Sequence, residues 1–179
     1  MTAPGLPLQI VEPPHPATLE LERLMRDCSI DRVRRSGPGG QHRNKVETGV
    51  VLIHTPTGVR VEATERRSQA ENLQQAQKRL RLALAVQVRT DTSEEYQPSA
   101  LWRSRCQGEK IVCSESHADF PALLAEALDL LARYGFDLKA AAETLGCTSS
   151  QLLKFVHKEP TAAVLFNAHR QSRGLKPLK

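Results

Sequence analysis

The sequence predicts an α+β fold, in which a small β-hairpin-centred domain with packed helices precedes a helical, helix-turn-helix-like C-terminal module. Three observations predict it. A β-branched run over residues 50–53 is followed by a turn and a second, alternating strand, which indicates a hairpin. Leucines and alanines then recur at helical spacing up to Val88. From Asp119 onward, helical segments alternate with glycine-containing turns.

Composition restricts the class of function before any motif is considered. Of the 179 residues, 25% are charged and 4% aromatic, so a packed core is feasible but must be mostly aliphatic. The net charge of +5 favours anionic partners, nucleic acid first, without choosing between RNA, DNA and a membrane surface. The sequence contains no apolar run of about 18 residues, so we expect no membrane-spanning segment. Residues 1–17 are rich in proline and predict a disordered or extended arm, not a signal peptide.

The four cysteines, Cys28, Cys106, Cys113 and Cys147, form no C-x-x-C pair. Cys106 and Cys113, with His117, would supply half of a zinc site, but a second half at usable spacing is missing. We therefore expect no metal and no cofactor. Reduced thiols in the cytoplasm are the preferred interpretation.

The N-terminal elements follow from local patterns. A short helix begins at Thr18, whose hydroxyl we expect to cap it, and ends at Asp27. A strand over residues 30–33 with a basic face follows. After a loop, the strand at 50–53 pairs with the strand that begins at Val59, because Pro-Thr-Gly between them makes a tight turn.

Beyond the hairpin, Ser68 is expected to cap a long helix, and Glu71 three residues later would complete a capping box. Residues 91–118 change in composition and predict a linker with one anchor, Trp102. Packing of this indole onto a domain is favoured over stacking on a base.

The C-terminal module should contain successive capped helices. One begins at Asp119 or Pro121 and ends at Gly135, and the next is capped by Asp137 and ends at Gly146. A third begins within Thr148-Ser149-Ser150. This spacing is that of a helix-turn-helix, but base-reading residues are few, with Gln151 and Lys154 the main exposed candidates. Two interpretations of this module stay open: a helix-turn-helix that reads bases in a nucleic-acid groove, and a plain three-helix packing unit.

The loop over residues 36–45 is the most informative stretch. Three glycines and a proline disfavour helix and strand, and glycine lets a backbone approach a ligand closely. The spacing fits neither G-x-G-x-x-G nor a P-loop, so a nucleotide cradle is not expected. Basic and hydrogen-bonding residues on both sides suit contact with an RNA end. A plain hairpin connection with solvated charges is the alternative.

In their order and spacing, these residues resemble the GGQ loop of the class I peptide chain release factor superfamily. Ser36-Gly37-Pro38 precedes Gly39-Gly40-Gln41, and Asn44-Lys45 follows. The resemblance continues through residues 54–59 and 65–69, and covers about residues 28–88. Within that superfamily, the chain resembles the stand-alone, codon-independent branch that rescues stalled ribosomes.

The resemblance implies hydrolysis of the ester bond of peptidyl-tRNA. Gly39, Gly40 and Gln41 are then the expected catalytic residues: the glycines leave the chain unobstructed, and the backbone N–H of Gln41 stabilises the developing oxyanion. The family's glutamine side chain shapes the water pocket. His42 receives a contact role instead of a general-base role, and Arg43 stands where many relatives carry an aliphatic residue.

Basic and polar residues around the loop, on the turn before the long helix and at the C-terminus are expected to contact RNA. They are Arg35, Ser36, Gly37, Pro38, His42, Arg43, Asn44, Lys45, Arg66, Arg67, Gln69, Arg170, Arg173, Lys176 and Lys179. Solvated charge is the alternative for the C-terminal group, and an ion pair with Glu65 is the alternative for Arg67.

The expected organisation has five parts. A disordered arm over 1–17 precedes a release-factor-like GGQ catalytic domain over 18–90, a linker over 91–118, a helix-turn-helix-like module over 119–166 and a basic tail over 167–179. A chain of this length has room for neither a codon-reading domain nor a long N-terminal helical domain. We expect no codon-reading Pro-x-Thr or Ser-Pro-Phe tripeptide, and hence no stop-codon recognition.

The expected partners are the ribosome, through the RNA of its peptidyl transferase centre, and peptidyl-tRNA. A glutamine methyltransferase acting on Gln41 is a further implied partner. We expect a cytoplasmic monomer with no membrane contact. Two alternatives stay open: an RNA- or ribosome-binding module for damaged or special ribosomes, with secondary or no hydrolysis, and, more weakly, a DNA-binding regulator.

Overall fold

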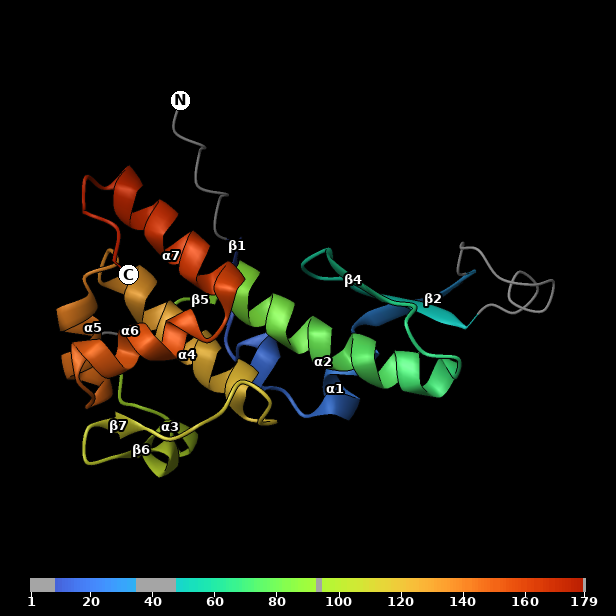
Figure 1. The fold of residues 1–179 in the computed structure, drawn as a ribbon, viewed down its shortest axis with the longest axis horizontal. Helices are drawn as coiled ribbons and strands as arrows, with labels where there is room; N and C mark the ends of the chain where they lie inside the picture. The colour runs from blue at the N-terminus through green and yellow to red at the C-terminus, as the bar shows by residue number, and fades with distance from the viewer. Residues whose placement is uncertain (1–8, 35–47, 93–94, 179) are drawn as a thin grey trace.

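A three-stranded antiparallel sheet and the long helix packed on it form one end of the molecule (Figure 1). The computed structural model describes residues 9–34, 48–92 and 95–178. The strands, in spatial order, are β2 (Cys28–Val33), β3 (Gly49–His54) and β4 (Val59–Ala63). Helix α2 (Gln69–Gln87) covers one face of β3 and β4. The predicted α+β fold class is confirmed.

The β3–β4 hairpin forms as the sequence predicts. Val50 pairs with Ala63 and Leu52 with Val61, so alternate residues face α2. Val50 and Leu52 are buried in the core that they share with the helix. Gly58, with a φ of 67°, supplies the left-handed residue of the turn.

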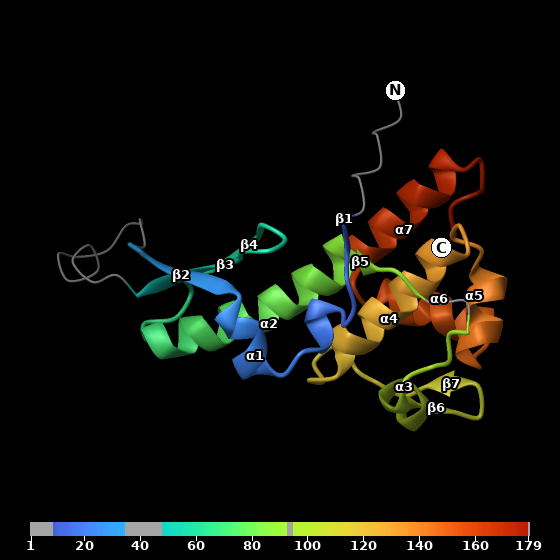
Figure 2. The same ribbon diagram turned by 180° about the vertical axis from the view of Figure 1, so that it is seen from behind.

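The start of the chain differs from the prediction. Residues 9–17 do not form a disordered arm: β1 (Gln9–Val11) pairs in parallel with β5 (Val88–Thr90), and a buried 3₁₀ turn, η1 (Pro16–Thr18), follows (Figure 2). The sequence pattern did not predict this pairing, because β5 lies far from β1 along the chain and the prolines near β1 are typical of irregular structure.

The predicted Thr18 cap is also wrong. Thr18 closes η1, and its hydroxyl donates to the carbonyl of His15 at 2.7 Å. Leu19 is extended, so helix α1 (Leu21–Arg26) begins anew after Glu20, whose side chain makes no capping bond. By contrast, Ser68 does cap α2 and accepts a hydrogen bond from the backbone N–H of Glu71 at 3.4 Å.

The segment predicted to be a linker contains regular structure. Helix α3 (Ala100–Arg105) leads into a short hairpin of β6 (Cys106–Gln107) and β7 (Lys110–Ile111). Trp102 is buried, and its indole N–H donates to the carbonyl of Leu145 at 2.7 Å. The preferred interpretation of Trp102 as a packing anchor is confirmed.

Four helices form the other end of the molecule (Figure 1). They are α4 (Phe120–Arg133), α5 (Leu138–Leu145), α6 (Ser149–His157) and α7 (Pro160–Ser172). Asp137 and Thr148 cap α5 and α6 as predicted, and Gly146 ends α5 with a φ of 68°. Helix α7 was not predicted. Its start signal is Glu159, which caps it, followed by proline at the first position.

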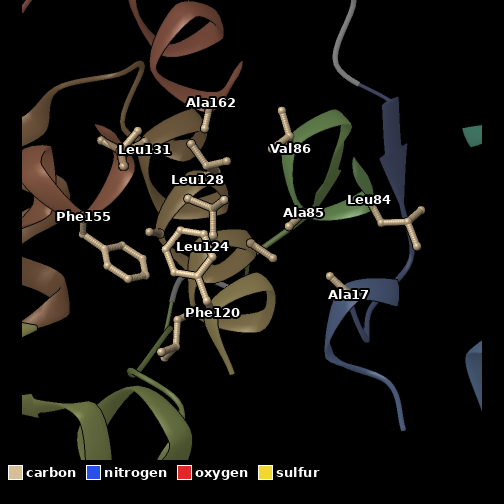
Figure 3. Packing of buried hydrophobic residues seen from close by; sticks show 14 of the residues in the cluster. Ala17, Leu84, Ala85, Val86, Phe120, Leu124, Leu128, Leu131, Phe155 and Ala162 are labelled. Carbon is tan, nitrogen blue, oxygen red and sulfur yellow. The ribbon is translucent and has the colours of Figure 1, made fainter. Parts of the chain in front are cut away.

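Helix α4 joins the two ends of the molecule through a shared core. Its apolar side chains lie between those of α2 and those of α6 and α7 (Figure 3). Leu84 and Ala85 of α2 and Phe155 of α6 belong to the same buried cluster. The sheet and the helical module are therefore held together by packing.

A buried ion pair reinforces this junction. Arg89 of β5 lies 3.2 Å from the Asp129 carboxylate of α4, and the backbone N–H of Thr90 also donates to that carboxylate. Burial lowers the pKa of Arg89 to about 10 and raises the pKa of Asp129 to about 6, although each charge favours the other. Removing one partner would leave the other charge buried and unpaired.

Within the described ranges, no helix is long and apolar enough to cross a membrane. The same residues contain no group of three histidine, cysteine, aspartate or glutamate side chains that could hold a metal ion. The four cysteines are free thiols, and burial raises the pKa of each.

Candidate functional site

The predicted catalytic residues Gly39, Gly40 and Gln41 lie outside the described residues, as do the predicted RNA contacts over 35–38 and 42–45. The structure describes the frame on either side of them. Strand β2 ends at Val33 before this segment, and β3 begins at Gly49 after it. Val33 and Gly49 are paired across the two strands.

Gly49 permits this pairing at close range. A Cβ atom at residue 49 would lie 2.7 Å from Cγ2 of Val33 and 2.8 Å from Cγ2 of Thr64. It would also lie 2.8 Å from the carbonyl oxygen of Val33. The space above this residue is therefore filled from both neighbouring strands. The sequence analysis missed Gly49, although a glycine inside a strand often marks a close approach.

Asn72 ties the base of the predicted loop to the turn that precedes α2. Its side chain is fully buried. The amide Nδ2 donates to the carbonyl of Thr48 at 2.7 Å and to the carbonyl of Arg66 at 3.0 Å. The amide oxygen accepts from the backbone N–H of Arg66 at 2.9 Å. One side chain thus holds the first described residue after the loop against the turn that carries two arginines.

The sequence carried a signal for Asn72 that the analysis overlooked. Asn72 lies four residues before Ala76 and eight before Leu80, both fully buried, so it occupies the apolar phase of α2. A polar residue in that phase has to find partners, because an unpaired buried amide is costly.

Two of the predicted RNA contacts lie on this turn. Arg66 and Arg67 are exposed, and in the described part of the chain neither guanidinium has a partner. The predicted alternative, pairing of Arg67 with Glu65, does not occur, because Glu65 pairs with Arg79 at 2.7 Å. The hydrogen bond from Arg79 lowers the pKa of Glu65. Gln69, the third predicted contact here, begins α2 and is half-buried.

The predicted C-terminal contacts lie elsewhere. Arg170 donates to the carbonyl of Phe136 at 2.7 Å, and the guanidinium of Arg173 lies 4.9 Å from the centre of the Phe136 ring. Both arginines therefore pack on the helical module, and Arg170 belongs to α7, not to a tail. Lys176 is exposed, and Lys179 lies outside the described residues.

The structure does not bring Arg170, Arg173 or Lys176 to the turn that carries Arg66 and Arg67. Helix α2 separates the turn at Arg66 from the helical module (Figure 1). At about 1.5 Å per residue, its 19 residues span about 28 Å. The predicted contacts thus form two separate groups.

One sequence expectation was wrong in detail. The chain does contain a Pro-x-Thr tripeptide, Pro16-Ala17-Thr18. Pro16 and Ala17 are buried in η1, and the Thr18 hydroxyl is bonded to the His15 carbonyl. In this conformation the tripeptide is not presented at the surface as a unit.

Comparison with known proteins agrees with the motif. The family model described as the RF-1 domain matches residues 18–116. The chain is 37% identical over 87 residues to peptide chain release factor 1 of Enterococcus faecalis, which covers 49% of this chain and 24% of that protein. It is 33% identical over 106 residues to the mitochondrial peptide chain release factor 1 of Homo sapiens, and the alignment covers 58% of this chain and 24% of that protein.

Peptide chain release factor 2 of Buchnera aphidicola is 48% identical over 63 residues, which cover 35% of this chain and 17% of that protein. The chain therefore spans about a quarter or less of the length of these relatives.

Proposed function

We propose, from the premise that the chain belongs to the RF-1 domain family, that it hydrolyses the ester bond of peptidyl-tRNA on the ribosome. The observation that carries the proposal is the frame around Gly39-Gly40-Gln41. Asn72 fixes the residue that follows the loop, and Gly49 lets the flanking strands close. A catalytic loop needs such support, because small displacements of reacting groups cost large factors in rate.

The proposed chemistry needs a hydrogen-bond donor and room for one water. Water attacks the ester carbonyl, and negative charge develops on the carbonyl oxygen and then on the leaving ribose oxygen. The backbone N–H of Gln41 is the proposed donor to this oxyanion, with Gly39 and Gly40 leaving access. Loss of one such donor typically costs about 10²–10³ in rate.

Arg66 and Arg67 are the proposed RNA contacts beside the loop. Their guanidiniums are exposed on the turn that Asn72 ties to the loop base. A guanidinium can bind a phosphate through two parallel hydrogen bonds. We assign them to ribosomal RNA or tRNA phosphates, and the proposed partners are therefore the ribosome, peptidyl-tRNA and, for Gln41, a glutamine methyltransferase.

Codon-independent rescue of stalled ribosomes in the cytoplasm is the finer part of the proposal. Two observations support it. Pro16 and Ala17 of the Pro-Ala-Thr tripeptide are buried in the η1 turn. The matched region shares its core with the helical module through α4. That module therefore accompanies the catalytic region as a packed unit.

The test is peptide release from purified ribosomes that carry peptidyl-tRNA on a message truncated at the P site. A stop-codon complex on full-length message serves for comparison. Wild type should release peptide chiefly on the truncated message, and Gln41→Ala should lose about 10²–10³ in rate while still binding. Equal release by Gln41→Ala and wild type would contradict the proposed mechanism. Release restricted to the stop-codon complex would contradict rescue.

A binding role without hydrolysis is the second candidate. The exposed basic face of α6, described below, favours it, because that face belongs to the helical module and not to the sheet that carries the loop base. Ribosome binding by wild type without release on either complex would support this candidate over the first.

A further inference from the structure

The outer face of α6 is hollowed. Five residues at helical spacing line a groove of about 390 Å³: Ser150, Leu153, Lys154, His157 and Lys158. The opposite face of the same helix, with Leu152, Phe155 and Val156, is buried in the core. The groove therefore lies on the side that α6 presents to solvent.

The charge of this groove has one sign. Of the described residues that line it, two are lysines, one is a histidine and none is acidic. Lys154 is exposed, and no described residue pairs with its ammonium group. The Lys158 ammonium donates to the carbonyl of Cys113 and lies 5.8 Å from the centre of the Phe155 ring. An ammonium has three N–H donors, so this contact positions Lys158 and leaves donors for a ligand.

His157 contributes part of its imidazole to the wall of the groove. Its Nε2 atom is buried and has no hydrogen-bond partner in the part of the chain that the structure describes, so this atom is not offered to a ligand at the surface. The imidazole lies between the two lysines in sequence and lines the same groove.

The position of α6 in the module points to a nucleic acid. Helix α6 follows α5 across a short turn that begins at Gly146, which is the chain order and turn length of a helix-turn-helix. In that arrangement, the N-terminal residues of the second helix contact base edges. Here the N-terminal positions carry Ser149, Ser150 and Gln151, whereas Lys154 lies in the C-terminal half and Lys158 follows the last residue of the helix. This distribution suits phosphate contact without base reading.

We propose that the α6 groove binds the phosphodiester backbone of a nucleic-acid duplex, independently of its sequence. Lys154 and Lys158 neutralise phosphates through their ammonium groups. With α2 about 28 Å long between them, this site and the loop base contact different nucleotides. The proposal does not depend on ester hydrolysis.

The experiment measures binding of the full chain to short fluorescent RNA and DNA duplexes of the same sequence by anisotropy, over a range of salt. Lys154→Ala is the test variant, because this exposed side chain has no described partner. Lys139→Ala is the matched control. It removes the same charge from an exposed position of α5, where the lysine lies 3.9 Å from Glu143. Circular dichroism checks that both variants fold.

Lys154→Ala should weaken duplex binding about eightfold at about 0.1 M salt, and its log K should fall less steeply with log salt, by about 0.9, because one fewer counterion is released. Lys139→Ala should bind as wild type does. A larger loss on RNA assigns the groove to RNA, a larger loss on DNA assigns it to DNA, and either supports the proposal.

Two results would overturn the proposal. The first is equal duplex affinity and equal salt dependence for Lys154→Ala and Lys139→Ala. The second uses fluorescent polyglutamate as a further probe: if Lys154→Ala weakens its binding and leaves both duplexes unchanged, the groove takes an acidic protein. Because the assay contains neither ribosomes nor peptidyl-tRNA, its failure would leave the hydrolysis proposal untouched.

Discussion

Replacing Asn72 by alanine should lower the free energy of unfolding by about 2 kcal/mol and slow peptide release by up to about a hundredfold. The side chain is fully buried and makes three hydrogen bonds, one to the carbonyl of Thr48 and two to the backbone of Arg66. Stability and release should both fall, because the same bonds hold the fold and the loop base.

The magnitude follows from these bonds. Each net hydrogen bond contributes about 1 kcal/mol, so the loss of all three costs about 3 kcal/mol. Alanine is the better helix former, and Asn72 lies within α2, which returns a little under 1 kcal/mol. The net cost is about 2 kcal/mol.

Urea unfolding measures the first effect, and the release assay on the truncated message measures the second. Gln74→Ala is the control, since Gln74 is an exposed residue of the same helix. Asn72→Asp separates the two halves of the amide: it keeps an acceptor for the Arg66 N–H but places a carboxylate against two carbonyl oxygens. It should destabilise at least as much as Asn72→Ala.

The reasoning would be refuted if Asn72→Ala unfolded at the same urea concentration as Gln74→Ala. A variant that lost stability yet released peptide at the wild-type rate, at a temperature where it is folded, would refute the positioning role alone. Loss of release with unchanged ribosome binding is the expected result.

Two further changes test the frame and the junction. Gly49→Ala should destabilise by about 1–3 kcal/mol, because its Cβ would lie 2.7 Å from a methyl group of Val33; an unchanged thermal midpoint would contradict this. Neutral His15 accepts from the Ala17 N–H and donates to the Val88 carbonyl, and burial lowers its pKa from 6.5 to about 4. Its stabilisation is therefore present above pH 6.5 and lost as pH falls through about 4, by about 3 kcal/mol. Between pH 6.5 and about 4, the free energy of unfolding should fall by about 3 kcal/mol less in His15→Gln than in the wild type. Equal pH dependence of unfolding in the two proteins would contradict the role assigned to His15.

Local chemistry explains which elements the sequence predicts correctly. The hairpin at Gly58, the caps at Ser68 and Thr148 and the left-handed end at Gly146 each depend on residues a few positions apart. Side-chain capping and positive φ are properties of such short segments, so pattern and structure agree.

Contacts distant in sequence explain what the sequence analysis missed. Strand β1 pairs with β5 although the partners Gln9 and Val88 are separated by almost the whole of the predicted domain over 18–90, and the prolines near the start of the chain gave no sign of this pairing. The sequence pattern predicted that Arg170 and Arg173 are solvated or bind RNA. In the structure, Arg170 donates to the carbonyl of Phe136 and the guanidinium of Arg173 lies over the Phe136 ring. Nothing in a one-dimensional pattern identifies such partners.

The candidate site shows the same contrast between what a local sequence pattern predicts and what depends on contacts distant in sequence. The identity of Gly39-Gly40-Gln41 rests on motif resemblance, since a glycine-rich loop by itself is compatible with many functions. The support for that loop could be recognised only in three dimensions. Asn72 was indicated by its phase in the helix, but its partners Thr48 and Arg66 are set by the packing of α2 on the hairpin.

Helix α2 gives the two proposed sites a fixed relation. Near its start, Asn72 holds the loop base, and beyond its end, Arg89 is bonded to Asp129 of α4. The Arg89 guanidinium also donates to the carbonyls of Ala85 and Val86, which anchors it to the last turn of α2. Because both anchors are buried, the loop base at Thr48 and the helical module are held at a defined separation. Removing Asp129 would leave the Arg89 guanidinium buried without its ionic partner, so an Asp129→Ala variant should unfold at a much lower urea concentration than the wild type.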